Sequence, residues 1–201
     1  MISSFLFIIF AVGIYGLVHS WLASIKVKQW ALDWIGPSRF RWYRLAYNVF
    51  SFISLLPVLA LAVVLPDRPI FNLPSPWSSV GVLLQLIGAG ISIYASVQTG
   101  LGRLAGLSQL VEKADQSSES KLQTDGLYRF VRHPIYSGAI LFLWASPQMS
   151  WNSLALKIAF TLYFIIGGQV EEKKLVTEFG DAYRLYRLRT PMIVPFTKKP
   201  E

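Results

Sequence analysis

The sequence has no cysteine and only two histidines, His19 and His133, among its 201 residues. The lack of cysteine excludes a disulfide framework, a thiol nucleophile and thiolate ligands for zinc. With only two histidines, we expect no metal site built from this chain alone. Charged residues are also scarce, at 15%, whereas 53% of residues are hydrophobic and the mean hydropathy is +0.45. This composition is too apolar for an ordinary soluble domain and predicts an integral protein of the lipid bilayer.

Acidic residues are outnumbered by basic ones, 11 against 19, which gives a formal charge of +8. Such an excess is also typical of nucleic-acid-binding proteins, but there the Lys and Arg residues gather in one stripe. Here they flank apolar runs. We therefore attribute the charge to membrane topology and expect no nucleic-acid partner.

Five apolar runs are candidate membrane spans. Three of them, residues 5–22, 45–65 and 80–101, are near the ~20 residues that a helix needs to cross. The other two, 135–149 and 153–168, reach only ~22 Å each at 1.5 Å per residue, against ~30 Å of hydrocarbon. We expect these two to form a short helical hairpin, so that residues 1–201 make one all-α membrane domain with five spans.

The basic residues predict the orientation of these spans. If the spans alternate, all 19 Lys and Arg residues except Arg68 and Lys157 fall on one side. By the positive-inside rule that side is cytoplasmic, which places the N-terminus outside and the C-terminus inside. No basic region precedes the first apolar run, so we expect it to be retained as a span rather than cleaved as a signal peptide.

Two further patterns concern packing. Small residues recur every four positions in the third span, at Gly88, Ser92, Ser96 and Gly100, which predicts a face that another helix approaches closely. Residues 171–187 have apolar or aromatic side chains at helical spacing, which predicts an amphipathic helix on the cytoplasmic surface.

Polar residues gather just before the fourth span, from Gly126 to Gly138. Pro134 suits the first turn of a helix because it lacks an amide hydrogen that would be unpaired there. The free amides and the positive end of the helix dipole would then face the cytoplasmic side. A hairpin that starts inside also finishes inside, so we expect Glu171 and Glu172 to lie close to Arg132 and His133.

Such a meeting of charges has two interpretations. An Arg–Glu pair near a membrane commonly serves only to close the helix bundle. The surrounding aromatic residues instead favour a site for a ligand that carries both charges. They are Tyr128, Tyr136 and Tyr183.

These residues resemble those of a known family, the integral membrane S-adenosylmethionine-dependent methyltransferases, which include isoprenylcysteine carboxyl methyltransferase and the phospholipid methyltransferases. The resemblance covers roughly the last 80 residues and rests on two motifs in the right order. They are Thr124 to Tyr128 continued by Arg132 to Gly138, then Glu171 and Glu172 with Leu175, Phe179 to Asp181, Tyr183, Tyr186 and Pro191. The N-terminal half, at His19 to Ser24 and Arg41 to Asn48, is more similar to the methanethiol S-methyltransferase and NnrU-like branch.

The resemblance implies a site for S-adenosylmethionine at the cytoplasmic end of the hairpin, with Arg132 and Glu171 as the catalytic residues. The cofactor-binding residues it implies are Tyr128, Arg132, His133, Pro134, Tyr136, Glu171, Glu172 and Tyr183. The chemistry of the donor agrees with this set. Its carboxylate suits Arg132 and the amides after Pro134, its ammonium suits Glu171, and its sulfonium suits aromatic faces.

The implied reaction is methyl transfer to a small thiol or a lipophilic, membrane-soluble acceptor. A thiol would need deprotonation, for which Glu171, Glu172 and His133 are candidate bases. Two alternatives remain at this stage. One is a nicotinamide-dependent reductase, because membrane sterol reductases carry a similar Arg-His-Pro-x-Tyr segment, although those proteins are usually larger. The other is a non-catalytic NnrU-like membrane protein.

Overall fold

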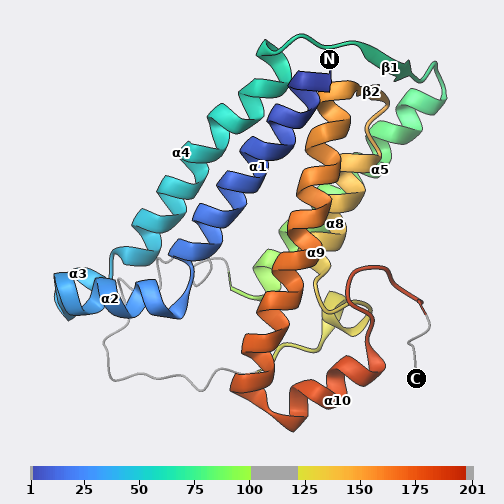
Figure 1. Cartoon of the computed structure of the whole chain (residues 1–201). Coiled ribbons are helices and arrows are strands. Elements are labelled where there is room, and N and C mark those ends of the chain that lie inside the picture. Colours follow the sequence, from blue (N-terminus) through green and yellow to red (C-terminus); the bar gives the residue numbers. More distant parts are fainter. Residues whose placement is uncertain (1, 101–121, 198–201) are drawn as a thin grey trace. The chain divides into compact units, whose positions relative to one another are not determined.

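The computed structural model describes residues 2–100 and 122–197, and these residues are mostly helical (Figure 1). They form two compact units. Unit 1 contains the chain up to Pro69 together with Ser150–Phe160. Unit 2 contains Ile70–Thr99 and, among the described residues that follow, 122–149 and 161–197.

Unit 1 is built on two long apolar helices, α1 (Ile2–Leu22) and α4 (Tyr43–Val64), which pack against each other (Figure 1). The buried residues of α1 recur once per turn along one stripe, at Ser4, Ile8, Val12 and Gly16. Two short helices, α2 (Ile25–Ile35) and α3 (Pro37–Phe40), connect the long ones. Helix α2 starts where the Ser24 hydroxyl accepts the Val27 amide, and it ends at Gly36, whose φ of 75° favours glycine.

The loop after α4 caps the start of α9 (Trp151–Phe179), whose first turns belong to unit 1. Asp67 Oδ1 accepts the backbone amide of Asn152 at 3.0 Å, and the Asn152 side chain donates to the carbonyl of Leu65 at 3.1 Å. The Trp151 amide donates to the Arg68 carbonyl at 3.1 Å. Asp67 therefore acts as an N-cap supplied from a distant part of the sequence.

Asp67→Ala is expected to destabilise the protein by about 1 kcal/mol at neutral pH, the usual cost of losing an N-cap. Burial would raise the pKa of Asp67, but hydrogen bonds from Ser150, Asn152, Arg68 and Trp151 outweigh it and lower the pKa below its usual value. The lowered pKa means that the stabilisation is present above the ordinary aspartate value of about 3.9 and is lost as the pH falls through the folded value.

Thermal denaturation of Asp67→Ala and the unmodified chain, each at neutral and at acidic pH, tests this cap. Asp33→Ala is the matched control, since Asp33 is exposed on α2. A difference for Asp67→Ala that persists unchanged at acidic pH would argue against a cap that depends on the carboxylate.

Unit 2 contains the remaining elements. They are a two-stranded sheet of β1 (Pro69–Asn72) and β2 (Gln148–Ser150), helix α5 (Trp77–Gln98), the 3₁₀ turn η1 (Gly126–Arg129), helix α8 (Pro134–Trp144), the later part of α9, and α10 (Asp181–Arg189). Helix α8 packs along α5 (Figure 1). It also runs antiparallel to α9, because Trp144 Nε1 donates to Thr161 Oγ1 at 3.0 Å and Tyr136 at its other end reaches Glu171.

The contact between α5 and α8 is made by the small residues of the predicted close-packing face. A Cβ atom on Gly88 would lie 2.6 Å from the Gly138 carbonyl oxygen and 2.7 Å from the Phe142 amide nitrogen. Ser92, one turn along, donates its hydroxyl to the Ile135 carbonyl at 2.9 Å. The predicted approach of another helix to this face is therefore confirmed at Gly88 and Ser92.

Gly88→Ala is expected to destabilise unit 2 by about 1–3 kcal/mol, because the new methyl group meets backbone atoms that cannot move aside. Gly90→Ala is the matched control on the same helix, since a Cβ there has nothing within 4 Å. The control should be neutral or gain up to about 1 kcal/mol from better helix propensity. Denaturation midpoints of the two variants in the same detergent make the comparison, and equal midpoints would refute the close contact.

Within residues 2–100 and 122–197, four helices, α1, α4, α5 and α9, are long and apolar enough to cross a membrane. Their large apolar side chains are mostly exposed, among them Leu17, Phe52 and Leu86, as expected for surfaces that lipid covers. The prediction of a mostly helical integral membrane protein is confirmed. The predicted span 135–149 is represented by α8, which ends at Trp144 and is only ~16 Å long, so four helices rather than five meet the length of a span.

The predicted span 153–168 and the predicted helix that begins at residue 171 are not separate elements. Helix α9 continues from Trp151 to Phe179 without interruption. The sequence changes from apolar to polar at Glu171, but this change does not remove any backbone hydrogen bond of the helix. The break comes instead at Gly180, with φ 56°, after which α10 starts. The predicted helix over 171–187 is therefore the end of α9 followed by a separate α10.

Candidate active site

The ionic centre of unit 2 is a buried pair between Arg132, just before α8, and Glu172 on α9. Arg132 Nε lies 2.6 Å from Glu172 Oε1, and the two side chains are 10% and 6% exposed. Arg187 of α10 approaches the other oxygen, with its Nε 3.2 Å from Glu172 Oε2. Glu172 is thus shared between two arginines, which compensates the cost of burying its charge.

The chain after α10 is fastened to the start of α8 by backbone groups. The amides of Arg132 and His133 donate to the carbonyls of Pro191 at 2.8 Å and Met192 at 3.0 Å. The guanidinium of Arg132 also donates to the Thr190 carbonyl, and the Ser137 hydroxyl donates to the Ile193 carbonyl at 2.6 Å. We call residues 190–193 the C-terminal strap. It uses two of the amides that precede the first turn of α8.

His133 lies between the two glutamates. Its Nδ1 is 3.7 Å from Glu171 Oε2 and its Nε2 is 3.4 Å from Glu172 Oε1. The imidazole stacks on the ring of Tyr136 at a centroid distance of 5.2 Å, and Tyr136 in turn stacks on Phe164 of α9 at 5.3 Å. The histidine is buried, so both its position and its ring plane are fixed.

Glu171 differs from its neighbour in being open. Its side chain is 48% exposed, and its Oε2 accepts the Tyr136 hydroxyl at 2.9 Å. The second carboxylate oxygen has no hydrogen-bond partner among the described residues. An exposed carboxylate beside a stacked aromatic column is suited to a cationic ligand.

Three tyrosines complete the cluster. Tyr186 of α10 donates its hydroxyl to the Tyr128 carbonyl at 2.6 Å, and its ring meets that of Tyr183 edge-on at 5.8 Å. Tyr183 is only 1% exposed. Burial, with a smaller contribution from Glu172, raises the pKa of Tyr183 to about 12, so its hydroxyl remains a neutral donor at physiological pH.

Within the described ranges the buried Tyr183 hydroxyl has no hydrogen-bond partner, and the buried His133 Nε2 has only the ionic contact with Glu172 Oε1 at 3.4 Å. Buried donors and acceptors are nearly always paired in proteins, so each exception needs an explanation. A polar ligand bound between these charged residues and aromatic rings could supply the missing hydrogen-bond partners.

The structure brings together all the residues expected from the sequence. Arg132, His133, Glu171 and Glu172 are within contact distance, Pro134 is the first residue of α8, and Tyr128, Tyr136 and Tyr183 surround them. Sequence reasoning missed Arg187 and the C-terminal strap. Among residues 2–100 and 122–197, no group of acidic or histidine side chains could hold a metal ion.

Comparison with known proteins assigns the chain to a family. Residues 8–190 match the model of a family described as "Protein of unknown function (DUF1295)". The chain is 32% identical to methanethiol S-methyltransferase of Pseudomonas sp. (strain GM41(2012)) over 191 residues, which cover 92% of this chain and 70% of the relative. It is 30% identical to methanethiol S-methyltransferase 2 of Bradyrhizobium diazoefficiens, over 91% of this chain and 70% of the relative.

A shorter match links part of the chain to another enzyme. Protein-S-isoprenylcysteine O-methyltransferase of Schizosaccharomyces pombe is 36% identical over 85 residues, 40% of this chain and 35% of the relative. No solved structure gives a significant match.

Proposed function

The chain belongs to the DUF1295 family and, with its relatives, to the membrane methyltransferases; from this membership we propose that it transfers a methyl group from S-adenosylmethionine to a small thiol or a lipophilic acceptor. The relatives named for methanethiol match over nearly the whole chain, which favours a thiol. The relative named for isoprenylcysteine matches over only 40% of this chain, and its name indicates a different acceptor.

The observation that carries the proposal is the open carboxylate of Glu171 beside the stack of His133, Tyr136 and Phe164. S-adenosylmethionine would supply an electrophilic methyl group on a positively charged sulfur. Glu171 would bind the ammonium group of the donor. The faces of Tyr128, Tyr136 and Tyr183 would favour the sulfonium, and the unpaired Tyr183 hydroxyl would be available to a polar group of the donor.

Arg132 would have two roles, one structural and one in donor binding. Most of its donors are committed to Glu172 and to the C-terminal strap, so it positions that glutamate and holds the strap. Its remaining exposed edge and the amides that follow Pro134 would receive the donor's carboxylate.

The contacts of Glu172 favour another residue as the base for a thiol acceptor. Glu172 is held by Arg132 and Arg187, and removing it from both would leave buried charge unpaired. Glu171 and His133 are not committed in this way. We therefore propose that one of these two removes the thiol proton.

We further propose that the chain crosses the membrane five times, with the N-terminus outside and the C-terminus cytoplasmic. The short helix α8 packs along α5, which is itself long enough to cross, and this supports a location for α8 within the bilayer. The excess of basic residues supports a cytoplasmic position for the ionic cluster and for α10.

A binding titration with the purified chain tests the donor. Saturable binding of S-adenosylmethionine and S-adenosylhomocysteine, without binding of NADPH, is expected. Transfer of labelled methyl from the donor to methanethiol, or to a panel of lipophilic thiols and acids, then tests the acceptor. Saturable NADPH binding without S-adenosylhomocysteine binding would instead indicate a reductase, and binding of neither would refute the proposal.

A further inference from the structure

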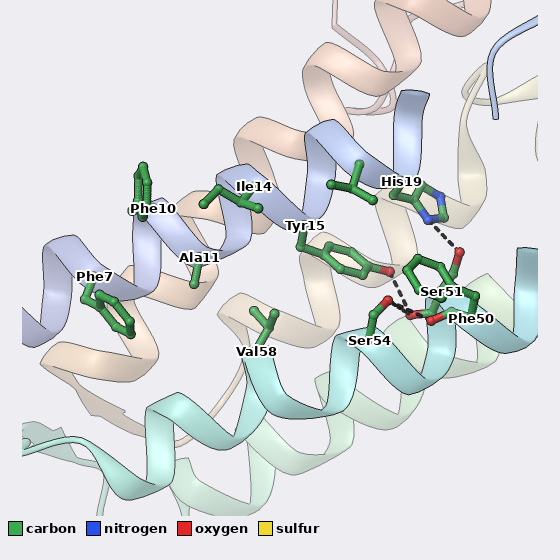
Figure 2. Close-up of a pocket in the computed structure, with 11 residues that line it drawn as sticks. Phe7, Phe10, Ala11, Ile14, Tyr15, His19, Phe50, Ser51, Ser54 and Val58 are labelled. Atoms are coloured by element: carbon green, nitrogen blue, oxygen red, sulfur yellow. Dashed lines mark hydrogen bonds between the residues drawn. The ribbon is translucent and has the colours of Figure 1, made fainter. Parts of the chain in front are cut away.

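Unit 1 contains a cavity of its own, between α1 and α4. Its volume of about 390 Å³ falls within the range of about 300–1,000 Å³ that is usual for ligand sites. Its lining residues all come from these two helices (Figure 2): Phe7, Phe10, Ala11, Ile14, Tyr15, Val18 and His19 from α1, and Phe50, Ser51, Ser54 and Val58 from α4. None of them belongs to the ionic cluster.

The cavity is elongated. The α1 residues that line it recur at intervals of three and four from Phe7 to His19, which is one helical face ~18 Å long at 1.5 Å per residue. Phe7 and Phe10 at one end are 51% and 64% exposed. The cavity is therefore a slot that a chain-like molecule can enter from the surrounding lipid, rather than a closed pocket for a compact one.

One end of the slot is apolar and the other is polar. Figure 2 shows Phe7 and Phe10 at the first end, with His19 and Ser51 at the second. There His19 Nδ1 lies 3.0 Å from Ser51 Oγ, and His19 Nε2 lies 2.6 Å from the Tyr47 hydroxyl. The Tyr15 hydroxyl donates to the Ser51 carbonyl at 3.2 Å. No lysine, arginine, aspartate or glutamate is among the lining residues.

This polarity determines which ligand the slot selects. Lipid tails are as apolar as the walls, so the apolar end alone gives little preference over bulk lipid. An ionisable residue within a membrane helix is costly, and it commonly marks a binding function. A charged head group would be buried without a counter-charge, whereas a neutral one can exchange hydrogen bonds with the histidine and serine.

We propose that the slot between α1 and α4 binds a neutral amphiphile, with a linear apolar tail along Phe7, Phe10 and Ile14 and a single hydroxyl or thiol head at His19 and Ser51. A neutral imidazole donates from one ring nitrogen and accepts at the other, so the Ser51–His19–Tyr47 chain can reverse its direction. It can therefore serve a head group that either donates or accepts. This site goes beyond the proposed methyl transfer and does not depend on it.

Binding of labelled dodecanol to the full chain in nanodiscs tests the site. Saturable binding is expected, with competition by dodecanethiol but not by dodecane or dodecanoate. Competition by dodecane equal to that by dodecanethiol would overturn the proposal, because the head group would then contribute nothing. Displacement by dodecanoate or by the phospholipid of the nanodisc would do the same, since both have charged heads.

Substitutions in and beside the slot test whether dodecanol binds there. Ala11→Trp, which fills the slot, is expected to abolish binding. Leu17→Trp is the matched control, because Leu17 is 73% exposed on the same helix and does not line the cavity. His19→Phe should weaken dodecanol binding about tenfold, because a lost hydrogen bond has an effect of about that size. If His19→Phe does not fold, Ser51→Ala replaces it, with the same expected effect. S-adenosylhomocysteine binding should be unaffected in all four variants, which separates this site from the donor site. Undiminished dodecanol binding in Ala11→Trp would overturn the proposal.

Discussion

Arg132→Ala is expected to destabilise the protein by about 3 kcal/mol or more, because it leaves the Glu172 carboxylate buried with an incomplete set of partners. It also removes the guanidinium that donates to the Thr190 carbonyl in the C-terminal strap. From the sequence alone, Arg132 would be expected to serve ligand binding without affecting the fold. Because the pair is buried, we expect the variant to lose both stability and donor binding. Thermal denaturation measures the first, and a binding titration with the donor measures the second.

Arg184→Ala provides the matched control for this result. Arg184 also pairs with a carboxylate, Asp181, at a similar distance of 2.7 Å, but the two side chains are 64% and 85% exposed. An exposed pair of this kind contributes about 0–1 kcal/mol. If the two alanine variants lost equal stability, burial would not be the source of the strength of the Arg132–Glu172 pair.

Glu171→Gln is expected to weaken S-adenosylhomocysteine binding about 10- to 100-fold while leaving the fold intact. The substitution removes the charge that would bind the ammonium group, and a hydrogen bond to a charged partner contributes about 1.5–3 kcal/mol. The fold should survive because the side chain is half exposed and a glutamine oxygen still accepts the Tyr136 hydroxyl. Calorimetric titration measures the affinity, and the denaturation midpoint measures the fold.

Glu178→Gln, two turns further along α9 and outside the cluster, should bind the ligand normally. Unchanged affinity in Glu171→Gln would mean that the ammonium lies elsewhere. A general loss of affinity in both variants would indicate an effect of net charge on α9 rather than a specific contact.

The meeting of Arg132 and His133 with the two glutamates could be predicted from the sequence, because it needs only two adjacent antiparallel helices. Which glutamate each residue contacts could not. Neighbouring residues on a helix point about 100° apart, so the rotation of α9 about its axis decides whether Glu171 or Glu172 faces inward. Packing sets that rotation, and it buries Glu172 while leaving Glu171 open.

The C-terminal strap was beyond prediction for a different reason. Its bonds to Arg132 and His133 are made by the carbonyls of Pro191 and Met192, and every residue has a carbonyl. Side-chain patterns predict where a helix stops, and they indicated correctly that Pro191 follows the last helix. They contain no information about where the following backbone docks.

The length of α9 has a consequence for the choice of membrane. From Trp151 to Glu171 the helix rises ~30 Å, which equals the hydrocarbon thickness of a typical bilayer. If Trp151 lies at one interface, where tryptophan is favoured, Glu171 would emerge at the other. Hydrophobic mismatch then acts directly on the open carboxylate: longer acyl chains would draw it into hydrocarbon, and shorter ones would leave it fully hydrated.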